Sequence, residues 1–305
     1  MPVGSVRRVF VGTQLFDYRR CVSYNTGEMP AVATDIAVHC LASGSSGNAL
    51  LVVAGGASLL IDAGLGVRTI TRELKRRGVS PESVSGALLT HEHIDHVRGA
   101  VPFSRRYKVP LIGTDGTLQT LLTQEGRDAP TQVVDSRGEI GVGVFGVRAV
   151  RTTHDAADPV GFRVAFGDFA LCYATDTGTL TPEFRDACVG ASLVAVESNH
   201  DIHKLRFGPY PDVVKARILS RQGHLSNNAA CDFLLAHVAE HGPVCAWLSH
   251  LSNVNNTPRM ALNYWKKRFT AEGFKTSPAA VEVALRDKPS LVFRSRSRAV
   301  QLALF

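Results

Sequence analysis

The first regular pattern in the chain is a series of short apolar runs separated by glycine and serine. Runs rich in valine, leucine and isoleucine occupy residues 36–42, 49–55 and 58–64. Each run has the length of a strand and is bounded by turn-forming residues, so we predict successive buried β-strands. A helix is predicted over residues 68–78, because Ile70 and Leu74 lie four residues apart, basic residues come late and Gly78 ends the segment.

Similar patterns return along the rest of the chain. Further strands are predicted over residues 86–90, 147–154, 160–167, 169–176, 192–198 and 245–250. Further helices are predicted over residues 117–126, 209–222, 228–241 and 257–273. The strands come first as a meander and later alternate with helices, so the pattern predicts an α/β fold with layers and mixed sheets. No internal repeat or low-complexity linker divides the chain.

We therefore expect one folded domain over residues 36–285. Residues 1–35 precede it without a clear periodicity or motif and are taken as an N-terminal extension of unknown order. Met29 stands just before the first patterned segment, and whether translation starts at Met1 or at Met29 stays open. Residues 286–305 include the stretch FRSRSRAV and are expected to form a basic C-terminal tail.

The composition is typical of a globular protein. A chain of 305 residues, 45% of them hydrophobic, can close a substantial core. No segment approaches the roughly 18 consecutive apolar residues of a membrane span, and the N-terminus lacks the apolar region of a secretory signal, so we expect a cytoplasmic protein. The six cysteines include no C-x-x-C pair and indicate no cysteine zinc site. A net charge of +7 is compatible with a polyanionic partner.

A cluster of histidines and carboxylates follows the apolar run at residues 86–90. In the segment HEHIDH, His91 and His93 lie two residues apart, and Asp95 and His96 follow at once. Residues two apart project together from a strand end or an extended loop but not from a helix. Imidazoles beside carboxylates suit Zn²⁺, Mn²⁺ or Fe, and two such sets can hold two ions. A single histidine at a strand end is usually structural, whereas this density predicts a metal site.

Further ligands are expected at the ends of later strands. His154 ends the run AVRTTH, Asp176 ends FALCYATD and His250 ends VCAWLSH. Each of them alone is compatible with an ordinary polar residue facing a loop. Their common position after apolar strands predicts that they complete the same site.

The HEHIDH segment matches the H-x-H-x-D-H motif of the metallo-β-lactamase superfamily residue for residue, and the chain resembles that superfamily over about residues 37–268. The resemblance implies a four-layer αββα sandwich with two mixed sheets and a site for two divalent ions at one edge. The implied ligands are His91, His93 and His154 for one ion, Asp95, His96 and His250 for the other, and Asp176 between them. Zn²⁺ and Mn²⁺ are expected, and Fe is also compatible. A hydroxide between the ions would be the nucleophile, because metal binding lowers the pKa of water from about 15.7 to around 7.

Further segments narrow the resemblance within that superfamily. The segments SGSSGNALLV (43–52), VESNHD (196–201), GHLSNNAA (223–230) and LSHLSNVNN (248–256) are similar to the YycJ (WalJ) family. This resemblance implies a 5′→3′ exonuclease that acts on DNA, a type of enzyme associated with mismatch repair in some bacteria. More distantly, the chain resembles tRNase Z.

Glu197 and His224 match a pair of residues that tRNase Z uses in catalysis. In those enzymes a glutamate at a strand end pairs with a histidine that opens the next helix and protonates the leaving oxygen. A carboxylate raises the pKa of an imidazole and fixes its tautomer, so such a pair suits general acid catalysis near neutral pH. We therefore predict Asp95, Glu197 and His224 as catalytic residues. His224 is also compatible with a plain polar helix start that Ser226 caps.

Four polar residues next to these motifs are predicted to contact the substrate. They are Asn48 in SGSSGN, Asn199 and His200 in ESNHD, and Asn255 in NVNNTP. A tight glycine turn, loop hydrogen bonding or helix capping would equally explain these residues, so that alternative stays open. The basic residues within 105–108, 204–206 and 266–268 are candidate DNA contacts, although most charged clusters are solvated faces.

The sequence thus predicts a binuclear-metal-dependent phosphodiesterase, foremost a 5′→3′ DNA exonuclease. The nearest alternative is a phosphodiesterase for small molecules such as cyclic phosphates or nucleotides. A thioester or lactam hydrolase is a third alternative. Asp95 argues against the lactamase branch, where a cysteine commonly enters the second metal site. A metal-binding sensor without catalysis is disfavoured because no expected ligand is missing. DNA is the expected partner, no membrane contact is expected, and a homo-oligomer is left open.

Overall fold

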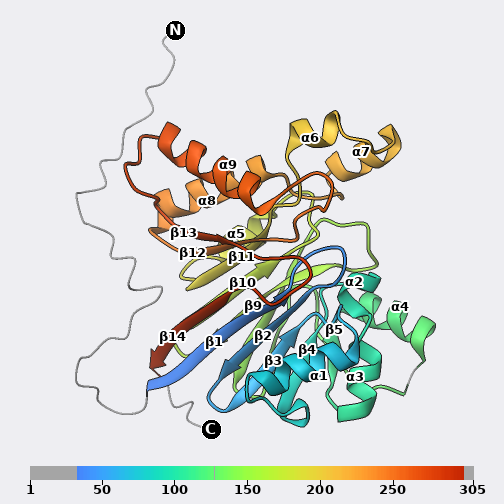
Figure 1. Cartoon of the computed structure of the whole chain (residues 1–305). Coiled ribbons are helices and arrows are strands. Elements are labelled where there is room, and N and C mark those ends of the chain that lie inside the picture. The colour runs from blue at the N-terminus through green and yellow to red at the C-terminus, as the bar shows by residue number, and fades with distance from the viewer. Residues whose placement is uncertain (1–32, 127, 299–305) are drawn as a thin grey trace.

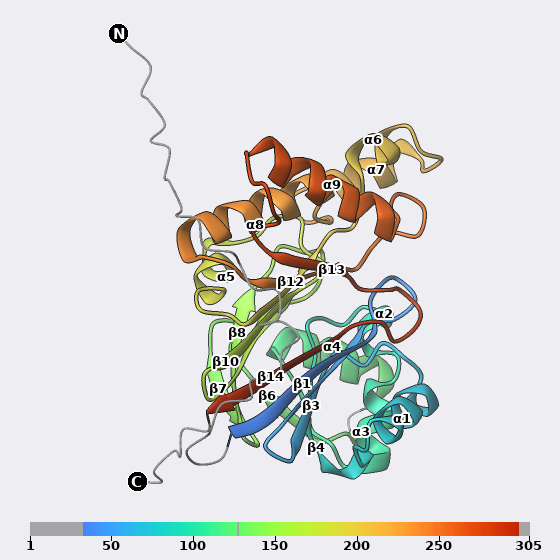
Figure 2. The same ribbon diagram turned by 60° about the vertical axis from the view of Figure 1, so that its left-hand side comes forward.

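The polypeptide folds around two β-sheets that pack face to face. The computed structural model describes residues 33–126 and 128–298. Figures 1 and 2 show the two sheets between outer layers of helices. The order of layers is therefore helix, sheet, sheet, helix, and the predicted αββα sandwich is confirmed.

The N-terminal half of the chain builds most of one sheet, called sheet A. Its strands are, in spatial order, β14 (Val292–Arg298), β1 (Ala33–Ala42), β2 (Ala49–Ala54), β3 (Ala57–Ile61), β4 (Val84–Leu88), β5 (Leu111–Gly113) and β6 (Thr131–Val133). Strands β1 to β3 pair antiparallel and β3 to β6 pair parallel, so the sheet is mixed as predicted. Its outer face is covered by α1 (Val67–Arg76), α3 (Ala100–Tyr107) and α4 (Asp115–Glu125).

The second half builds sheet B in the same manner. Its strands are, in spatial order, β13 (Ala280–Val283), β12 (Cys245–Ser249), β11 (Leu193–Glu197), β10 (Phe169–Ala174), β9 (Val160–Phe166), β8 (Phe145–Arg151) and β7 (Glu139–Val142). Strands β7 to β10 pair antiparallel and β10 to β13 pair parallel. Its outer face is covered by α5 (Pro182–Ala187), α8 (Asn227–His241) and α9 (Pro258–Ala271).

Four short helical elements lie outside these layers. They are the 3₁₀ helix η2 (Pro81–Ser83), α2 (Ile94–Val97), α6 (Ile202–Arg206) and α7 (Asp212–Leu219). Helix α2 follows β4 and carries part of the HEHIDH segment. Both Figure 1 and Figure 2 show α6 and α7 side by side, projecting beyond the body of the sandwich.

Strand β10 shows why the central strands read as continuous apolar runs. Its residues alternate between two hydrophobic layers, because successive side chains of a strand point to opposite faces. Phe169 and Tyr173 pack between the two sheets, whereas Cys172 and Ala174 pack under the helices that cover sheet B. Burial of each large apolar side chain contributes about 1.5–3 kcal/mol, so the inter-sheet layer holds the two halves of the site at a fixed spacing.

The predicted domain boundary at residue 285 is wrong. Residues 292–298 form β14, which pairs antiparallel with β1 in sheet A, with Val38 opposite Phe293. Phe293 is buried between the sheets, and its ring lies 5.7 Å from the ring of Phe169. The segment reads VFRSRSR, in which arginine and serine alternate with the period of a strand. The basic composition of this segment is typical of a tail, whereas its period of two is that of a strand.

The N-terminal boundary of the fold also differs from the prediction. Strand β1 begins at Ala33, so the last residues of the predicted N-terminal extension belong to the fold. Residues 1–32 and Met29 with them lie outside the described residues, as do residues 299–305. Along the two stretches that the structure describes, no helix has both the length and the apolar character needed to cross a membrane.

Candidate metal centre

The predicted ligands gather where strands of both sheets end. His91 comes shortly after β4, His154 after β8, Asp176 after β10 and His250 directly after β12. These strands bring their carboxyl ends to one edge of the sandwich, so ligands as far apart in the chain as Asp95 and His250 become neighbours. Hydrogen bonds support this arrangement from the backbone, since His250 N–H donates to Ser43 Oγ of the opposite sheet at 2.9 Å.

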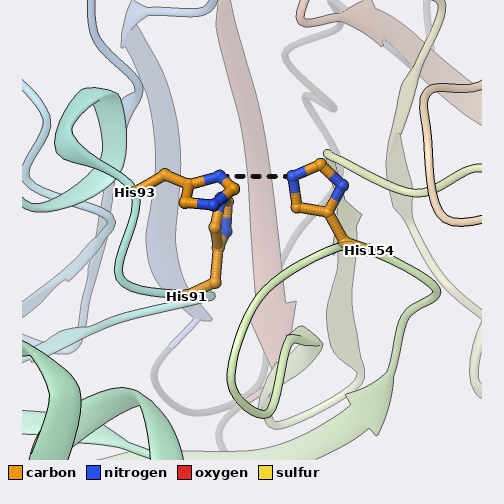
Figure 3. A group of neighbouring side chains, drawn as sticks. All are labelled: His91, His93 and His154. Atoms are coloured by element: carbon orange, nitrogen blue, oxygen red, sulfur yellow. Dashed lines mark hydrogen bonds between the residues drawn. The ribbon is translucent and has the colours of Figure 1, made fainter. Parts of the chain in front are cut away.

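Three imidazoles form the first donor group. Nitrogen atoms of His91, His93 and His154 lie within 4.8 Å of one another. In Figure 3 the rings of His93 and His154 face each other from opposite sides, with His91 below them, and His93 Nδ1 lies 3.3 Å from His154 Nε2. His93 reaches this position because it precedes the first turn of α2 in an extended conformation. The three nitrogen atoms thus converge on one point from both sheets.

A second donor group lies beside the first. Atoms of Asp95, His96 and His250 also lie within 4.8 Å of one another. Asp95 Oδ2 is 3.6 Å from His250 Nε2 and 3.7 Å from His96 Nε2. The short helix α2 presents Asp95 and His96 together, whereas His250 comes from the far sheet. This group therefore also spans the interface between the sheets.

Asp176 lies between the two groups. Its Oδ2 is 2.9 Å from His96 Nε2 of the second group, and its Oδ1 is 3.7 Å from His154 Nε2 of the first. Burial works against the charged carboxylate, but the imidazoles of His250 and His96 hold the pKa of Asp176 well below its usual range. A carboxylate that stays ionised and contacts both groups can share its two oxygen atoms between two cations.

Buried carboxylates determine which nitrogen of each imidazole faces the centre. His96 Nδ1 lies 2.8 Å from Asp62 Oδ2, and His250 Nδ1 lies 2.8 Å from Glu197 Oε1. Because each Nδ1 faces its carboxylate, Nε2 is the ring nitrogen that faces the donor group. This second layer of carboxylates is the arrangement that orients imidazole ligands in metal sites.

The chemistry of the donor set fits metal cations. Within residues 33–126 and 128–298, the buried atoms His91 Nε2 and His250 Nε2 have no hydrogen-bond partner, which is costly for a polar atom without a ligand. Burial and the neighbouring imidazole of His96 hold the pKa of His91 well below its usual value, so its lone pair is free. Burial opposes a charge on His96, yet the carboxylates of Asp62 and Asp176 raise its pKa to about 10, so this position attracts positive charge.

Sequence reasoning missed Asp62. The residue follows β3, is fully buried, and accepts hydrogen bonds from Thr90 N–H at 2.9 Å and Thr90 Oγ1 at 3.0 Å in addition to the contact with His96. The signal was present, because Asp62 ends the apolar run SLLID just as Asp176 ends FALCYATD. An acidic residue at the end of a buried strand needs a partner, and that criterion would have found it.

Glu197 and His224 form the predicted pair. Glu197 Oε1 lies 2.8 Å from His224 Nδ1 and 2.8 Å from His250 Nδ1, so one carboxylate oxygen serves two imidazoles. Burial raises the pKa of Glu197, but the two imidazoles outweigh it and lower the pKa to about 2. Burial likewise opposes the charge on His224, yet the Glu197 carboxylate raises the pKa of this imidazole above its usual value. A protonated His224 is therefore favoured to higher pH than a free histidine.

Three site residues adopt a strained backbone conformation. Asp62, Asp176 and His250 have φ angles of 60°, 53° and 52°, and only one other non-glycine residue of the described chain, Lys108, has a positive φ. This left-handed region is uncommon for residues with a side chain and costs of order 1–3 kcal/mol each. All three follow β-strands directly or within two residues, where the turn redirects the side chain from the sheet toward the centre.

The four predicted substrate contacts differ in their surroundings. Asn48 is fully buried, with Nδ2 3.0 Å from His96 Nε2, and Asn199 Nδ2 donates to His250 O at 3.0 Å, so both support the ligand loops. His200 and Asn255 are also almost fully buried, but their side-chain polar atoms have no hydrogen-bond partner among the described residues. A direct contact of any of the four with substrate stays a prediction.

Comparison with known proteins assigns the family. The model of the beta-lactamase superfamily domain matches residues 58–250, which includes every residue of both donor groups. The chain belongs to the metallo-β-lactamase superfamily. The resemblance and the fold class predicted from the sequence are thereby confirmed.

Relatives within this superfamily narrow the similarity further. The chain is 34% identical to exodeoxyribonuclease YycJ of Bacillus anthracis over 246 residues, which cover 78% of this chain and 91% of that protein. It is 33% identical to exodeoxyribonuclease WalJ of Streptococcus pneumoniae, over 72% of this chain and 83% of that protein. Both matches confirm the similarity to the YycJ (WalJ) family inferred from the short segments.

The solved structures agree on the fold. The metallo-β-lactamase fold protein YhfI of Bacillus subtilis superposes with a TM-score of 0.63 over 85% of this chain and 99% of YhfI, at 19% sequence identity. At that identity the superposition supports the fold alone. Together with the His/Asp donor groups, membership of this superfamily confirms the interpretation of the chain as a metal-dependent hydrolase.

Proposed function

We propose that this protein is a metal-dependent exodeoxyribonuclease that degrades DNA from a 5′ end. The proposal rests above all on one observation: Asp176 lies between two donor groups, close to a histidine of each, in a chain whose YycJ and WalJ relatives are named exodeoxyribonucleases. Such paired sites suit the in-line displacement of a phosphodiester, which develops charge on both the attacking and the leaving oxygen. Polyanionic DNA also matches the net charge of +7.

The two donor groups would hold two divalent ions. The proposed ligands are His91, His93 and His154 for one ion, Asp95, His96 and His250 for the other, and Asp176 for both. Imidazole with carboxylate suits Zn²⁺ and Mn²⁺, and also Fe. When bound, the ions supply Lewis acidity and an activated water at neutral pH.

The chain itself supplies proton transfer and orientation. His224 would donate a proton to the departing sugar oxygen, since Glu197 favours its charged form and the side chain is 19% exposed at the site. Glu197 Oε2 accepts hydrogen bonds from the backbone N–H of Thr177 at 2.9 Å and of Leu225 at 3.1 Å, so the orientation of the carboxylate is fixed. The same carboxylate orients His250, which couples the acid to the second donor group.

The decisive experiment is digestion of 5′-labelled and 3′-labelled duplex DNA by protein loaded with Mn²⁺ or Zn²⁺. We expect rapid release of short 5′-labelled products by the wild type and none by Asp95→Ala, with Asp135→Asn, at an exposed turn outside the site, as a matched control that retains activity. Intact DNA together with efficient hydrolysis of bis(p-nitrophenyl) phosphate would refute the exonuclease and favour a small-molecule phosphodiesterase. The same preparations would report the metal content. A cytoplasmic location and the oligomeric state stay predictions.

A further inference from the structure

The α6–α7 hairpin, defined as residues 202–222, projects from the edge of the sandwich that carries the metal centre. Figures 1 and 2 show its two helices standing clear of the body. Only Leu205 of this segment is buried, and α7 has no buried residue at all. A segment that contributes so little to the core is not explained by packing.

Both ends of the hairpin are attached to the site. It begins a few residues after Glu197 and ends just before His224. These two residues are in contact, because Glu197 Oε1 lies 2.8 Å from His224 Nδ1. At the same end, His154 Nδ1 lies 3.2 Å from Gln222 O, so the hairpin also fixes the orientation of a ligand of the first donor group. Whatever binds the hairpin is thus held next to the reacting groups.

The surface of the hairpin combines unpaired cations with exposed apolar residues. Lys204, Arg206 and Arg221 have no carboxylate within salt-bridge distance in the part of the chain that the structure describes, whereas its other two cations, at 215 and 217, are ion-paired. Phe207 and Val213 are both 77% exposed, more than any other large apolar residue described. Free cations beside an exposed aromatic ring are the combination that binds a phosphate backbone and its bases.

The ring of Phe207 is held in place although it is exposed. It packs against His203 one turn earlier in α6, with ring centroids 4.6 Å apart and planes inclined at 45°. This contact supports one side of the ring and leaves much of the ring accessible to solvent. A supported aromatic surface costs little conformational entropy when a base stacks on it.

A cavity connects the hairpin with the first donor group. It measures about 740 Å³ and is lined by residues 151–154, 156–159 and 220–222. His154 is therefore part of its wall, and Arg151 and Arg221 contribute positive charge. The cavity has the size of a small-ligand site and is large enough to take a nucleotide next to the metal centre.

We propose that the α6–α7 hairpin binds an unpaired DNA end, with a base stacked on Phe207 and phosphates contacted by Lys204, Arg206 and Arg221. The proposal rests on the proposed nuclease function and specifies the form of its substrate. An unpaired strand is favoured, because both faces of a base in the interior of a duplex are already stacked. The hairpin would then guide the end of the strand through the cavity toward the metal centre.

A second copy of this chain fits the hairpin less well. Two exposed apolar side chains, Phe207 and Val213, offer little area compared with the roughly 800 Å² per partner of a stable interface. A symmetric contact would also bring the unpaired cations of two hairpins together, which is unfavourable. Charge complementarity therefore favours a polyanion.

The test measures binding separately from cleavage. Fluorescence anisotropy with a labelled 12-nucleotide single strand, in EDTA so that no hydrolysis occurs, compares the full-length wild type with Phe207→Ala, Phe207→Leu and Phe207→Trp. Val213→Ala is the matched control, since the residue is equally exposed and apolar but has no ring. We expect Phe207→Ala and Phe207→Leu to weaken binding by about 5- to 100-fold, and Phe207→Trp and Val213→Ala to bind as the wild type does.

Several results would overturn the proposal. The proposal is refuted if all variants bind with equal affinity, or if Phe207→Ala and Val213→Ala lose the same affinity. It is also refuted if the wild type does not bind single strands. Conversion of a dimer to a monomer by Phe207→Ala, seen by light scattering with unchanged DNA affinity, would assign the surface to a second copy instead. Because binding is measured without cleavage, a wild type that binds single strands through Phe207 but degrades no DNA would refute the nuclease and leave the hairpin proposal standing.

Discussion

The two halves of the sandwich supply the metal centre in different ways. Sheet A contributes four donors from the six consecutive positions of HEHIDH, two from the loop after β4 and two from the short helix α2. Sheet B contributes His154, Asp176 and His250 singly, each from the end of a different strand. Local sequence thus sets the geometry of the sheet-A donors, whereas strand register sets that of the sheet-B donors. The residues that join these elements both come from sheet B. Asp176 lies between the two donor groups, and Glu197 contacts both His224 and His250.

The largest effect is expected at the residue that joins the two donor groups. Asp176→Asn removes the charge shared between them and should lower phosphodiester hydrolysis by about 10³-fold, on the scale of losing a group that acts directly in the transition state. Metal content, measured by mass spectrometry, should fall for both ions together. Asp135→Asn is the control on an acidic residue outside both groups and outside the cavity. Loss of one ion with activity retained would show that Asp176 is not shared.

A smaller effect is expected at the carboxylate of sheet B that serves two imidazoles. Glu197→Gln should lower kcat by about 10²-fold. In the wild type Glu197 raises the pKa of His224, and a general acid loses activity as pH rises through its pKa. The alkaline limb of the pH–rate profile should therefore move to lower pH in the variant. Glu139→Gln, on an exposed strand, should leave the profile unchanged, and an unshifted limb in Glu197→Gln would contradict the general-acid role.

The corresponding carboxylate of sheet A should matter less. Asp62 orients one imidazole, His96, so Asp62→Asn is expected to weaken metal affinity by about 10- to 100-fold. Titration of the metal-free protein with Mn²⁺ measures this, with Asp135→Asn in an exposed turn as the control. If Asp62→Asn lost as much metal affinity as Glu197→Gln or more in the same titration, the expected difference between the two halves would be contradicted.

The smallest effect concerns stability away from the site. His39 of β1 is buried near Arg77 and Arg294, and burial together with these guanidinium groups lowers its pKa from 6.5 to about 4. A depressed histidine pKa means that the unfolded chain takes up the proton first, so stability is present at neutral pH and is lost as pH falls below about 6.5. Between pH 7 and pH 5, the free energy of unfolding measured with a denaturant should fall by about 2 kcal/mol more in the wild type than in His39→Gln. Parallel pH curves for the two proteins would exclude this role.

Much of the centre could be predicted because its signals are local. The four donors of HEHIDH are contiguous. The other three, His154, Asp176 and His250, each end an apolar run, and the end of a run can be recognised without knowing which strand pairs with it. Their grouping into two sets depended on the family resemblance, and the distances support those sets.

The remaining features depend on contacts between distant segments. No local pattern indicates that Glu197 would bind His250 as well as His224, since that contact requires β11 and β12 to lie in register. Strand β14 was missed for a related reason: its partner, β1, lies more than 250 residues earlier in the chain. Composition describes a segment alone, whereas pairing depends on the edge that a sheet leaves open.

The left-handed turns at Asp62, Asp176 and His250 have a consequence for evolution. Glycine or asparagine would relieve the backbone strain at each position. A library selected only for heat resistance should therefore accumulate such replacements there and lose its metal ions. Under selection for activity the same three positions should not change, and the protein keeps its centre at the expense of heat resistance.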